Sequence, residues 1–380
     1  MQIDDYGFAK KKKPRFIMEL ILEKAKDQFN QNLPFVIYKK PENNSIDGLF
    51  QKNDTLFEVT NFDEKGFVFA SFDGSQTFIL PENQSERITA LFQKNEITIL
   101  DSAPDYANEL DKNKFKNLIS KGIQAIENNE FKKVVLSRKE TIDLVDFDVI
   151  AVFEKLVHLY PSTFVYCFFH PKVGIWLGAT PEQLLQANDS DFKTIALAGT
   201  QKDKGATEII WHKKEEEEQQ FVTDYIVGKV KNIATKLLVS KPYSVKAGSM
   251  WHIKTDISGT LNSGFGLLKV IQLLHPTPAV CGFPKEVTKE FILKNENYNR
   301  TFYTGFLGEL NIANKTDLFV NLRCMEIEVS SATADKSKLA MTKAYLFMGC
   351  GITKESIPEK EWEESVHKST TMRKVLDNRE

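Results

Sequence analysis

The sequence predicts a large α/β (α+β) fold in which β-sheets pack as a sandwich and helices flank them. Apolar stretches of strand length are mixed with amphipathic helical stretches along all 380 residues. Their order has no βαβ rhythm, and no GxGxxG or P-loop motif occurs, which argues against a doubly wound nucleotide-binding fold. The composition, 42% hydrophobic and 27% charged, is that of an ordinary globular protein.

The first 110 residues read as a structural flank of the same fold. Apolar residues at helical spacing predict a helix over residues 15–31. Strands are expected at 35–38 and 56–60, and a hairpin within 66–80 that turns at Asp73-Gly74. Reactive side chains do not gather here, so we expect residues 111–380 to form the catalytic region.

The second region alternates helices and strands. Helices are predicted at 110–127, 148–159, 208–236, 265–274 and 286–294, and from Pro358, a residue that suits a first helical turn. Strands are predicted at 133–138, 163–170, 174–178, 194–198, 250–257, 302–310, 318–329 and 343–347. This mixture fits a compact sandwich.

Charge and cysteine content exclude several classes of protein. The net charge of −2 gives no field that attracts nucleic acid or an anionic membrane, and the basic run Lys10–Lys13 is read as a solvated helix start. The four cysteines form no CxxC pair. Neither the apolar core of a signal peptide nor a stretch of about 20 apolar residues is found. We therefore expect a cytoplasmic protein with free thiols.

Two helical segments concentrate carboxylates. Glu215 and Glu218 lie three residues apart, as do Glu361 and Glu364, so each pair shares one helix face. Two such faces brought together would offer four oxygen ligands of the kind that Mg²⁺ prefers. A solvated charged face is the alternative, and spacing alone does not exclude it.

Lys133 and Glu182 could form an acid–base pair. Lys133 opens the apolar stretch KVVLSR, and Glu182 follows the turn GATPE. In water only about one lysine in 2,500 is neutral at pH 7, and about one glutamate in 500 is protonated. A dry pocket shifts both groups toward their neutral forms. The alternatives are a lysine that snorkels from a strand end and a glutamate that caps a turn.

Ten motifs in order resemble the chorismate-binding family, which includes isochorismate, salicylate, anthranilate and aminodeoxychorismate synthases. They are KVVLSR, GATPEQLL, LAGT, KKEEEEQQFV, WHIKTDISG, HPTPAVCGFP, FYTGFLG, LRCME, GCGI and EWEES. The resemblance covers about residues 110–375. It implies an anthranilate synthase component I-like sandwich, a Mg²⁺ cofactor and the small-molecule substrate chorismate.

The resemblance also assigns roles to residues. It makes Glu215, Glu218, Glu361 and Glu364 the Mg²⁺ site, with Glu218 and Glu364 as direct ligands. Arg323 would hold the enolpyruvyl carboxylate through a bidentate fork. The other positions matched to the substrate site are Gly199, Thr200, His252, His275, Ala279, Tyr303, Phe347, Gly349, Gly351 and Lys368. For the two histidines a structural role remains an equal alternative.

Lys133 separates the branches of the family. Members that add water resemble this sequence in having lysine there, whereas members that add ammonia carry glutamine. The resemblance therefore implies that Lys133 activates water for attack at C2 and that Glu182 protonates the departing C4 hydroxyl, with no glutaminase subunit. Ala279 and Phe347 favour isochorismate synthase over its main rival, salicylate synthase. A non-catalytic chorismate-binding protein is the further alternative, and a monomer or weak homodimer is expected.

Four departures from the family pattern stand out. GCGI replaces GAGI, Met348 occupies a position where a small residue is frequent, LAGTQ lacks a following arginine, and Gln219 stands where histidine is common. They bear on substrate affinity and metal geometry and leave every proposed catalytic group in place. Whether the product enters menaquinone, siderophore or salicylate metabolism is left open by the sequence.

Overall fold

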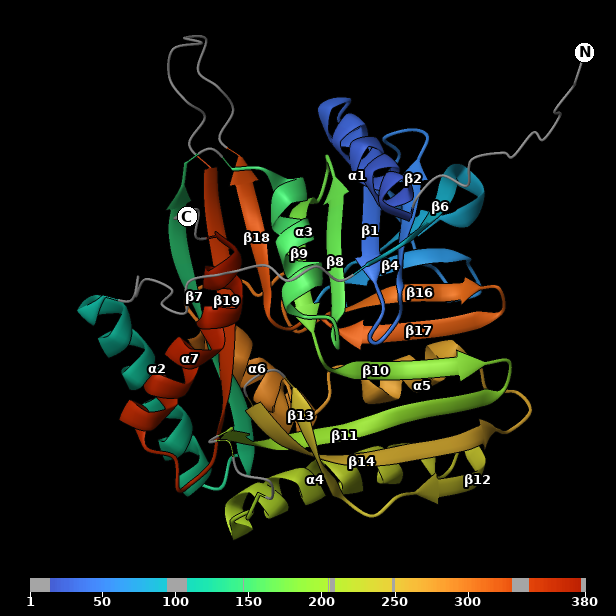
Figure 1. Cartoon of the computed structure of the whole chain (residues 1–380). Coiled ribbons are helices and arrows are strands. Elements are labelled where there is room, and N and C mark those ends of the chain that lie inside the picture. Colours follow the sequence, from blue (N-terminus) through green and yellow to red (C-terminus); the bar gives the residue numbers. More distant parts are fainter. Residues whose placement is uncertain are drawn as a thin grey trace, which may run out of the picture.

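The computed structural model describes residues 14–93, 108–145, 147–203, 205, 209–247, 250–329 and 342–376. Two large antiparallel sheets cross each other in it, with the strands of the first running upright in Figure 1 and those of the second running across. The basic run Lys10–Lys13 lies outside the described residues, so its interpretation stays a prediction.

The first sheet is built from strands of both halves of the chain. Within the described residues its order is β15 (Gly282–Phe283), β7 (Lys133–Leu144), β19 (Thr342–Ile352), β18 (Cys324–Val329), β9 (Gly174–Thr180), β8 (Phe164–His170), β1 (Phe35–Lys39), β2 (Ser45–Gln51) and β6 (Ser85–Leu91). A short 3₁₀ helix, η1 (Glu82–Gln84), precedes β6. The N-terminal strands β1, β2 and β6 thus extend the sheet that also carries β7 and β19.

The second sheet is also built from strands of both halves of the chain. Its described order is β12 (Ala234–Val239), β14 (Met250–Leu261), β11 (Asp191–Lys202), β10 (Gln183–Asn188), β17 (Lys315–Val320), β16 (Phe306–Ile312), β4 (Gly66–Ala70), β5 (Thr77–Pro81) and β3 (Phe57–Glu58), with β13 (Tyr243–Ala247) paired to β14. The first hundred residues therefore supply strands to both sheets. The division of the chain into a structural flank (residues 1–110) and a catalytic region (residues 111–380) stays a prediction.

An aromatic core fills the space between the sheets. Phe69 of β4 stacks on Phe302 with ring centroids 4.3 Å apart, and Phe164 of β8 stacks on Phe319 of β17 at the same distance. Such pairs add packing energy beyond the burial of their area. This core fixes the two sheets against each other.

Helices cover the outer faces and complete the sandwich. Apolar side chains of α1 (Pro14–Asn30), α3 (Val149–Leu159) and α7 (Pro358–Leu376) pack on the first sheet. Those of α4 (Lys213–Val230) and α5 (Leu267–Leu274) pack on the second. The helices α2 (Glu109–Glu127) and α6 (Lys285–Asn295) join α7 against β7 and β19. The predicted sandwich of sheets flanked by helices is confirmed.

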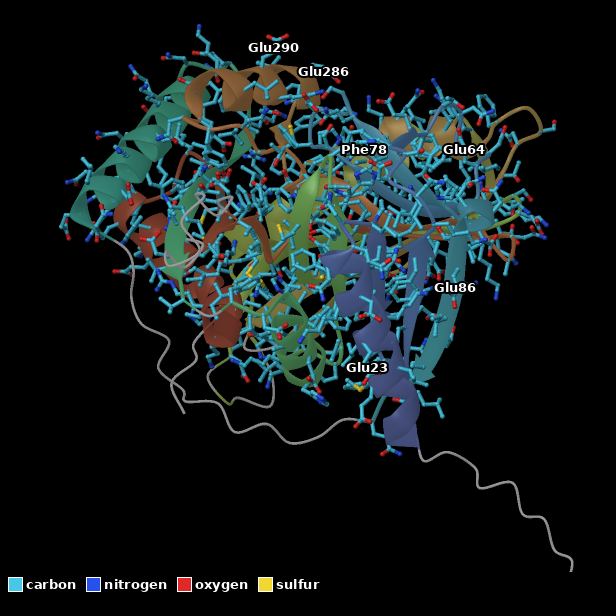
Figure 2. All side chains as sticks on the ribbon, turned by 90° about the horizontal axis from the view of Figure 1, so that it is seen from above. Glu23, Glu64, Phe78, Glu86, Glu286 and Glu290 are labelled. Carbon is cyan, nitrogen blue, oxygen red and sulfur yellow. The ribbon has the colours of Figure 1, made fainter. Side chains whose placement is uncertain are left out.

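Carboxylates on the outer helices and edges remain in solvent. In Figure 2, Glu286 and Glu290 project from α6 at the periphery, and Glu23 and Glu86 lie on α1 and β6.

None of the helices that the structure describes is long and apolar enough to cross a bilayer. The four cysteines are free and buried.

Several predicted bounds differ from the structure, and three of these differences are instructive. The helix predicted at 208–236 is too long, because α4 ends at Val230 and β12 pairs with β14 as an edge strand. The strand predicted at 318–329 is two strands, β17 in one sheet and β18 in the other. The strand predicted at 302–310 begins only at Phe306. In the first two cases pairing with a distant strand overrides local propensity. In the third, residues 302–305 form turns, in which Gly305 N–H donates to the Phe302 carbonyl at 3.0 Å.

A buried ion pair between Arg300 and Glu296 stabilises the segment that precedes β16. Arg300 Nη2 lies 2.6 Å from Glu296 Oε1, and both side chains are only 1% exposed. The same guanidinium donates to the carbonyls of Val135 at 2.7 Å and Val280 at 3.0 Å. Arg300 therefore ties β7 to two separate turns.

We predict that Arg300→Met lowers the free energy of unfolding by about 3–5 kcal/mol, because the Glu296 carboxylate is left buried without its partner. The double variant with Glu296→Gln should lose less. Urea denaturation measures both. Lys24→Met, which removes an exposed pair with Glu86 at 3.0 Å, is the control and should cost under about 1 kcal/mol. Equal losses for Arg300→Met and Lys24→Met would contradict this account.

Candidate active site

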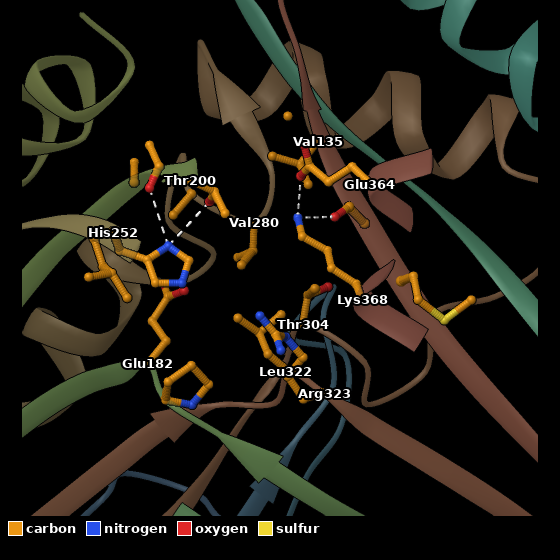
Figure 3. Close-up of a pocket in the computed structure, with 18 of the residues that line it drawn as sticks. Val135, Glu182, Thr200, His252, Val280, Thr304, Leu322, Arg323, Glu364 and Lys368 are labelled. Atoms are coloured by element: carbon orange, nitrogen blue, oxygen red, sulfur yellow. Dashed lines mark hydrogen bonds and ion pairs between the residues drawn. The ribbon is translucent and has the colours of Figure 1, made fainter. Parts of the chain in front are cut away.

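One cavity of roughly 170 Å³ lies where the two sheets meet α4 and α7. Its walls come from β7, β11, β14, β19, both helices and the turns that join the sheets. Figure 3 shows Glu182 and His252 on one side, Glu364 and Lys368 on the other, and Arg323 between them. Segments that are far apart in the chain thus converge on one enclosed space.

Glu182 sits where the chain leaves the first sheet for the second, between β9 and β10. Val320 N–H donates to the Glu182 carbonyl at 2.9 Å, and Glu182 N–H donates to Thr180 Oγ1 at 3.3 Å. Burial raises the pKa of the Glu182 carboxyl to about 7, although the ammonium groups of Lys133 and Lys368 act to lower it. Glu182 is therefore suited to carry a proton near neutral pH.

Arg323 lies at the second crossing, between β17 and β18. Its backbone has a φ of 46°, a conformation that costs free energy in a non-glycine residue. Arg323 Nη1 donates to Thr371 Oγ1 of α7 at 3.0 Å, and Tyr160 donates to the Thr371 carbonyl at 2.9 Å. Thr371 therefore orients a guanidinium that lines the cavity.

His252 faces the cavity as a neutral ring. Its Nδ1 lies 3.2 Å from the Gly199 carbonyl and 3.2 Å from Thr200 Oγ1. Since a carbonyl only accepts, Nδ1 carries the proton and Nε2 is left as an acceptor. Burial, with the charges of Arg323 and Lys368, lowers the pKa of His252 to about 4. The ring is thus uncharged at pH 7.

Two helices bring four carboxylates to the cavity wall. Glu215 and Glu218 come from α4, and Glu361 and Glu364 come from α7. Each helix therefore directs both members of its i, i+3 pair to the same space. Charged side chains this close to one another require counter-ions.

Lysines supply those counter-ions. Lys133 Nζ lies 2.7 Å from Glu218 Oε1, and Lys368 Nζ lies 2.6 Å from Glu364 Oε1. Lys368 also donates to the Gly349 carbonyl at 2.8 Å. Burial alone would lower the pKa of Lys368, but the Glu364 carboxylate outweighs it and the pKa is raised. Lys368 is therefore a fixed positive charge on the wall.

Two carboxylates of α7 lie close enough to each other to share a hard divalent cation. Carboxylate oxygens of Glu361 and Glu364 and the Cys350 sulfur all lie within 4.8 Å of one another. Cys350 donates to the Glu361 carbonyl at 3.3 Å, and burial raises its pKa well above that of a free thiol. The sulfur therefore stays a thiol and leaves the oxygens as ligands.

Glycines make room for these carboxylates. A Cβ on Gly351 would stand 3.0 Å from Glu218 Oε1 and 3.2 Å from Lys133 Cε. A Cβ on Gly199, where β11 bulges at φ 70°, would stand 3.1 Å from Glu215 Cβ. The backbone of β11 and β19 can approach α4 closely only because these side chains are absent.

Most of the predicted site residues line this cavity. They are Glu182, Gly199, Thr200, Glu215, Glu218, His252, Ala279, Tyr303, Arg323, Phe347, Gly349, Gly351, Glu361, Glu364 and Lys368. Lys133 is adjacent but stands behind Glu218, with 2% of its surface exposed. The structure thus brings together segments that the sequence could only order along the chain.

His275, unlike Lys133, has its side chain directed to other partners than the residues of the cavity. Its Nε2 lies 3.2 Å from the Ser71 carbonyl, and its ring meets Phe306 edge-on at 4.9 Å. Burial lowers its pKa to about 4. The structure therefore does not bring His275 to the cavity and gives it the packing role that was its alternative.

Sequence reasoning missed several wall residues. They are Val135, Pro181, Leu197, Ala198, Val280 and Thr304. All six fall inside motifs already quoted: Val135 in KVVLSR, Pro181 in GATPEQLL, Leu197 and Ala198 in LAGT, Val280 in HPTPAVCGFP and Thr304 in FYTGFLG. Thr304 in FYTG has a φ of 61°, and only its three-dimensional turn places it at the wall.

Gln219, one of the departures, anchors α4. Its Nε2 lies 2.7 Å from Thr255 Oγ1 of β14 and 2.9 Å from Thr223 Oγ1, and the residue is 2% exposed. The glutamine thus keeps the helix seated on the second sheet next to Glu218.

The crossed sheets hold one cavity whose wall carries both carboxylates and cationic side chains. A family model described as chorismate binding enzyme matches residues 66–377. The chain belongs to this chorismate-binding enzyme family, and the resemblance seen in the motifs is confirmed.

Individual relatives agree with this assignment. Isochorismate synthase EntC of Escherichia coli (strain K12) is 28% identical over 274 residues, which cover 69% of this chain and 66% of that protein. The chain thus spans just under two thirds of that relative's length. The menaquinone-specific isochorismate synthase MenF from Escherichia coli has a TM-score of 0.73 at 20% identity, covering 90% of this chain and 89% of that one.

A solved structure that is not named as an isochorismate synthase shares the fold as well. Anthranilate synthase component I from Streptococcus pneumoniae TIGR4 superposes with a TM-score of 0.64 at 17% identity, covering 89% of this chain and 90% of that chain. The anthranilate synthase component I-like fold is therefore confirmed. At this level of identity the likeness concerns the fold alone.

We predict that Gly351→Ala reduces turnover more than tenfold and leaves the fold intact, because the new Cβ displaces Glu218 or Lys133. Steady-state rates and a thermal melt measure the two effects. Gly228→Ala in α4, where a Cβ would meet nothing within 4 Å, is the matched control and should keep full activity. A fully active Gly351→Ala enzyme would show that the close packing at Gly351 has no functional role.

Proposed function

We propose that this protein is an isochorismate synthase, an isomerase that converts chorismate to isochorismate by adding water at C2 and releasing the C4 hydroxyl. The observation that carries the proposal is the pair formed by Lys133 and Glu182. Both are buried beside one cavity. The motif resemblance matches the lysine to the position at which ammonia-adding members of the family carry glutamine.

The cavity suits a ring with two carboxylates. The fixed charges of Lys368 and Arg323 can hold one carboxylate through charge-assisted hydrogen bonds. Gly199, Thr200 and the neutral acceptor of His252 offer polar contacts on the opposite side. Phe347, whose ring stacks on those of Trp176 and Tyr303 with centroids 5.4 and 5.3 Å apart, contributes apolar surface to the cavity wall.

Mg²⁺ is the proposed cofactor. Glu215, Glu218, Glu361 and Glu364 would hold it, with Glu218 and Glu364 as direct ligands. When bound, the ion would clamp and orient the ring carboxylate of the substrate. The hard oxygen set and the glycine-lined approach to it support this assignment.

The acid–base work falls to the chain itself. Lys133 as a free amine takes a proton from water while the oxygen bonds to C2. The two ring double bonds shift, the C4–O bond breaks, and Glu182 gives its proton to the departing hydroxyl. One water enters and one leaves, so the product is an isomer of the substrate. Burial of Glu182 supplies the protonated acid that this step needs.

Two alternatives remain as outcomes of the test. Salicylate synthase would continue to pyruvate elimination, but Ala279 and Phe347 line the cavity with carbon atoms and add no further acid or base. A non-catalytic chorismate-binding protein would not need Lys133 and Glu182 beside one cavity. With water as the nucleophile, a glutaminase subunit is not required, and we propose a cytoplasmic monomer or weak homodimer.

Incubation with chorismate and Mg²⁺, followed by chromatography, tests the reaction. We expect isochorismate without salicylate or pyruvate. Lys133→Ala should lower turnover at least a hundredfold while its circular dichroism spectrum stays unchanged. Salicylate plus pyruvate would select the rival synthase, and full turnover by Lys133→Ala would remove Lys133 from the mechanism.

The alkaline side of the pH–rate profile should report Glu182. Since its pKa is raised to about 7 and the acid works only when protonated, loss of its proton should lower the slope of log kcat/KM against pH by one near that value. This change of slope is expected even if the fraction of Lys133 present as a free amine rises over the same range. Glu182→Gln should have low activity without this change of slope. A wild-type profile of constant slope from pH 6 to 9 would contradict the assignment.

A further inference from the structure

Two lysines hold the carboxylates that a cation would need. Lys133 pairs with Glu218 of α4, and Lys368 pairs with Glu364 of α7, at 2.7 and 2.6 Å. Each lysine thus forms an ion pair with the second glutamate of one helical pair. These two glutamates, Glu218 and Glu364, are the residues proposed as direct ligands. In this state the ammonium groups occupy the same carboxylates as a divalent cation would.

The position of Lys133 does not match its proposed task. Glu218 lines the cavity, whereas Lys133 does not, and its side chain is 2% exposed. The ammonium lies behind the carboxylate, beside Gly351, where a Cβ would be 3.6 Å from Nζ. To reach a water molecule in the cavity, the amine must first leave Glu218.

We propose that Lys133 and Lys368 are resident counter-ions of the cation site, and that a divalent cation binding Glu218 displaces Lys133 and frees its amine to reach the cavity. A doubly charged ion attracts the carboxylate more strongly than an ammonium group does and repels that ammonium at short range. The competition for Glu218 follows from the geometry. The use of the freed amine as a base rests on the proposed function.

This exchange imposes an order on the site. The cation binds first, Lys133 leaves Glu218, and only then can the amine act on water. Lys368 differs because it has a second partner, the Gly349 carbonyl at 2.8 Å. It can give up Glu364 and stay at the wall as a positive charge.

Cation affinity tests the competition directly. Mn²⁺ binding is measured by calorimetry at fixed pH and ionic strength, without chorismate. Lys133→Met should bind Mn²⁺ roughly tenfold more tightly than wild type or better, the effect of removing one charge-assisted competitor. Lys133→Arg, which keeps a positive charge, should stay close to wild type. Lys132→Met is the matched control, since Lys132 is exposed and lies over the Phe221 ring at 5.8 Å, and should bind Mn²⁺ as wild type does.

An unchanged or weaker affinity in a folded Lys133→Met protein would overturn the proposal. A second measurement uses the wild-type chain, so it does not depend on a variant. A small amine-reactive acetylating reagent is applied, and labelling is measured by mass spectrometry. Labelling of Lys133 should increase severalfold on saturation with Mg²⁺, while labelling of Lys132 stays constant. Equal labelling of Lys133 with and without Mg²⁺ would exclude its release.

These results separate the inference from the proposed function. Tighter Mn²⁺ binding by Lys133→Met, together with a wild-type protein that leaves chorismate unchanged, would uphold the exchange and refute the synthase assignment. Conversion of chorismate to isochorismate with no change in Mn²⁺ affinity would uphold the assignment and refute the exchange.

Discussion

Burial of charge at the junction of the two sheets is the constraint on which this structure depends. Five glutamates, two lysines and an arginine lie in or beside the wall of one small cavity. Charges withdrawn from water are tolerated only with partners at hydrogen-bond distance. The Lys133–Glu218 and Lys368–Glu364 pairs meet that requirement, and Glu182 meets it differently, by holding a proton.

The fold delivers these groups at the points where the chain changes sheets. Glu182 lies between β9 and β10, and Arg323 lies between β17 and β18. The two crossings touch, since the N–H of Val320 donates to the Glu182 carbonyl and the N–H of Ala179 donates to the Arg323 carbonyl. An acid and a cation are thereby fixed relative to each other by backbone hydrogen bonds. Rigid placement of this kind is what acid–base chemistry requires.

Helix α7 adds a continuous stripe of functional residues along the cavity. Glu361, Glu364, Lys368 and Thr371 follow one another at spacings of three and four, so they share one face. They run from the carboxylate cluster to the residue that orients Arg323. With the proposed Mg²⁺ held by Glu361 and Glu364, this stripe would offer positive charge at both ends to a ligand with two anionic groups.

Local sequence patterns predicted what depends on one element. The i, i+3 glutamates of α4 and α7 and the strand that begins at Lys133 needed only helical or strand periodicity. The crossing at Arg323 could not be predicted, because residues 318–329 look like one apolar strand. The break depends on distant partners of Asn321, which accepts from the Tyr166 hydroxyl and donates to the Phe302 carbonyl.

The same limit applies to residues whose role came from resemblance. His275 matched a site position, but its place was decided by contacts with Ser71 and Phe306 on another strand and turn. Lys133 was expected at the cavity wall, and its pairing with Glu218 from 85 residues away is a property of the folded chain. Resemblance to a family can identify a candidate residue, but the packing of the folded chain determines which groups its side chain contacts.

The central claim is that Glu182 carries a proton in the resting cavity near neutral pH. Infrared difference spectroscopy of the wild-type protein against Glu182→Gln measures this directly. The account predicts a protonated-carboxyl C=O band at pH 6 that is absent in the variant and gives way to carboxylate bands as the pH rises through about 7. Carboxylate bands alone at pH 6 would contradict it.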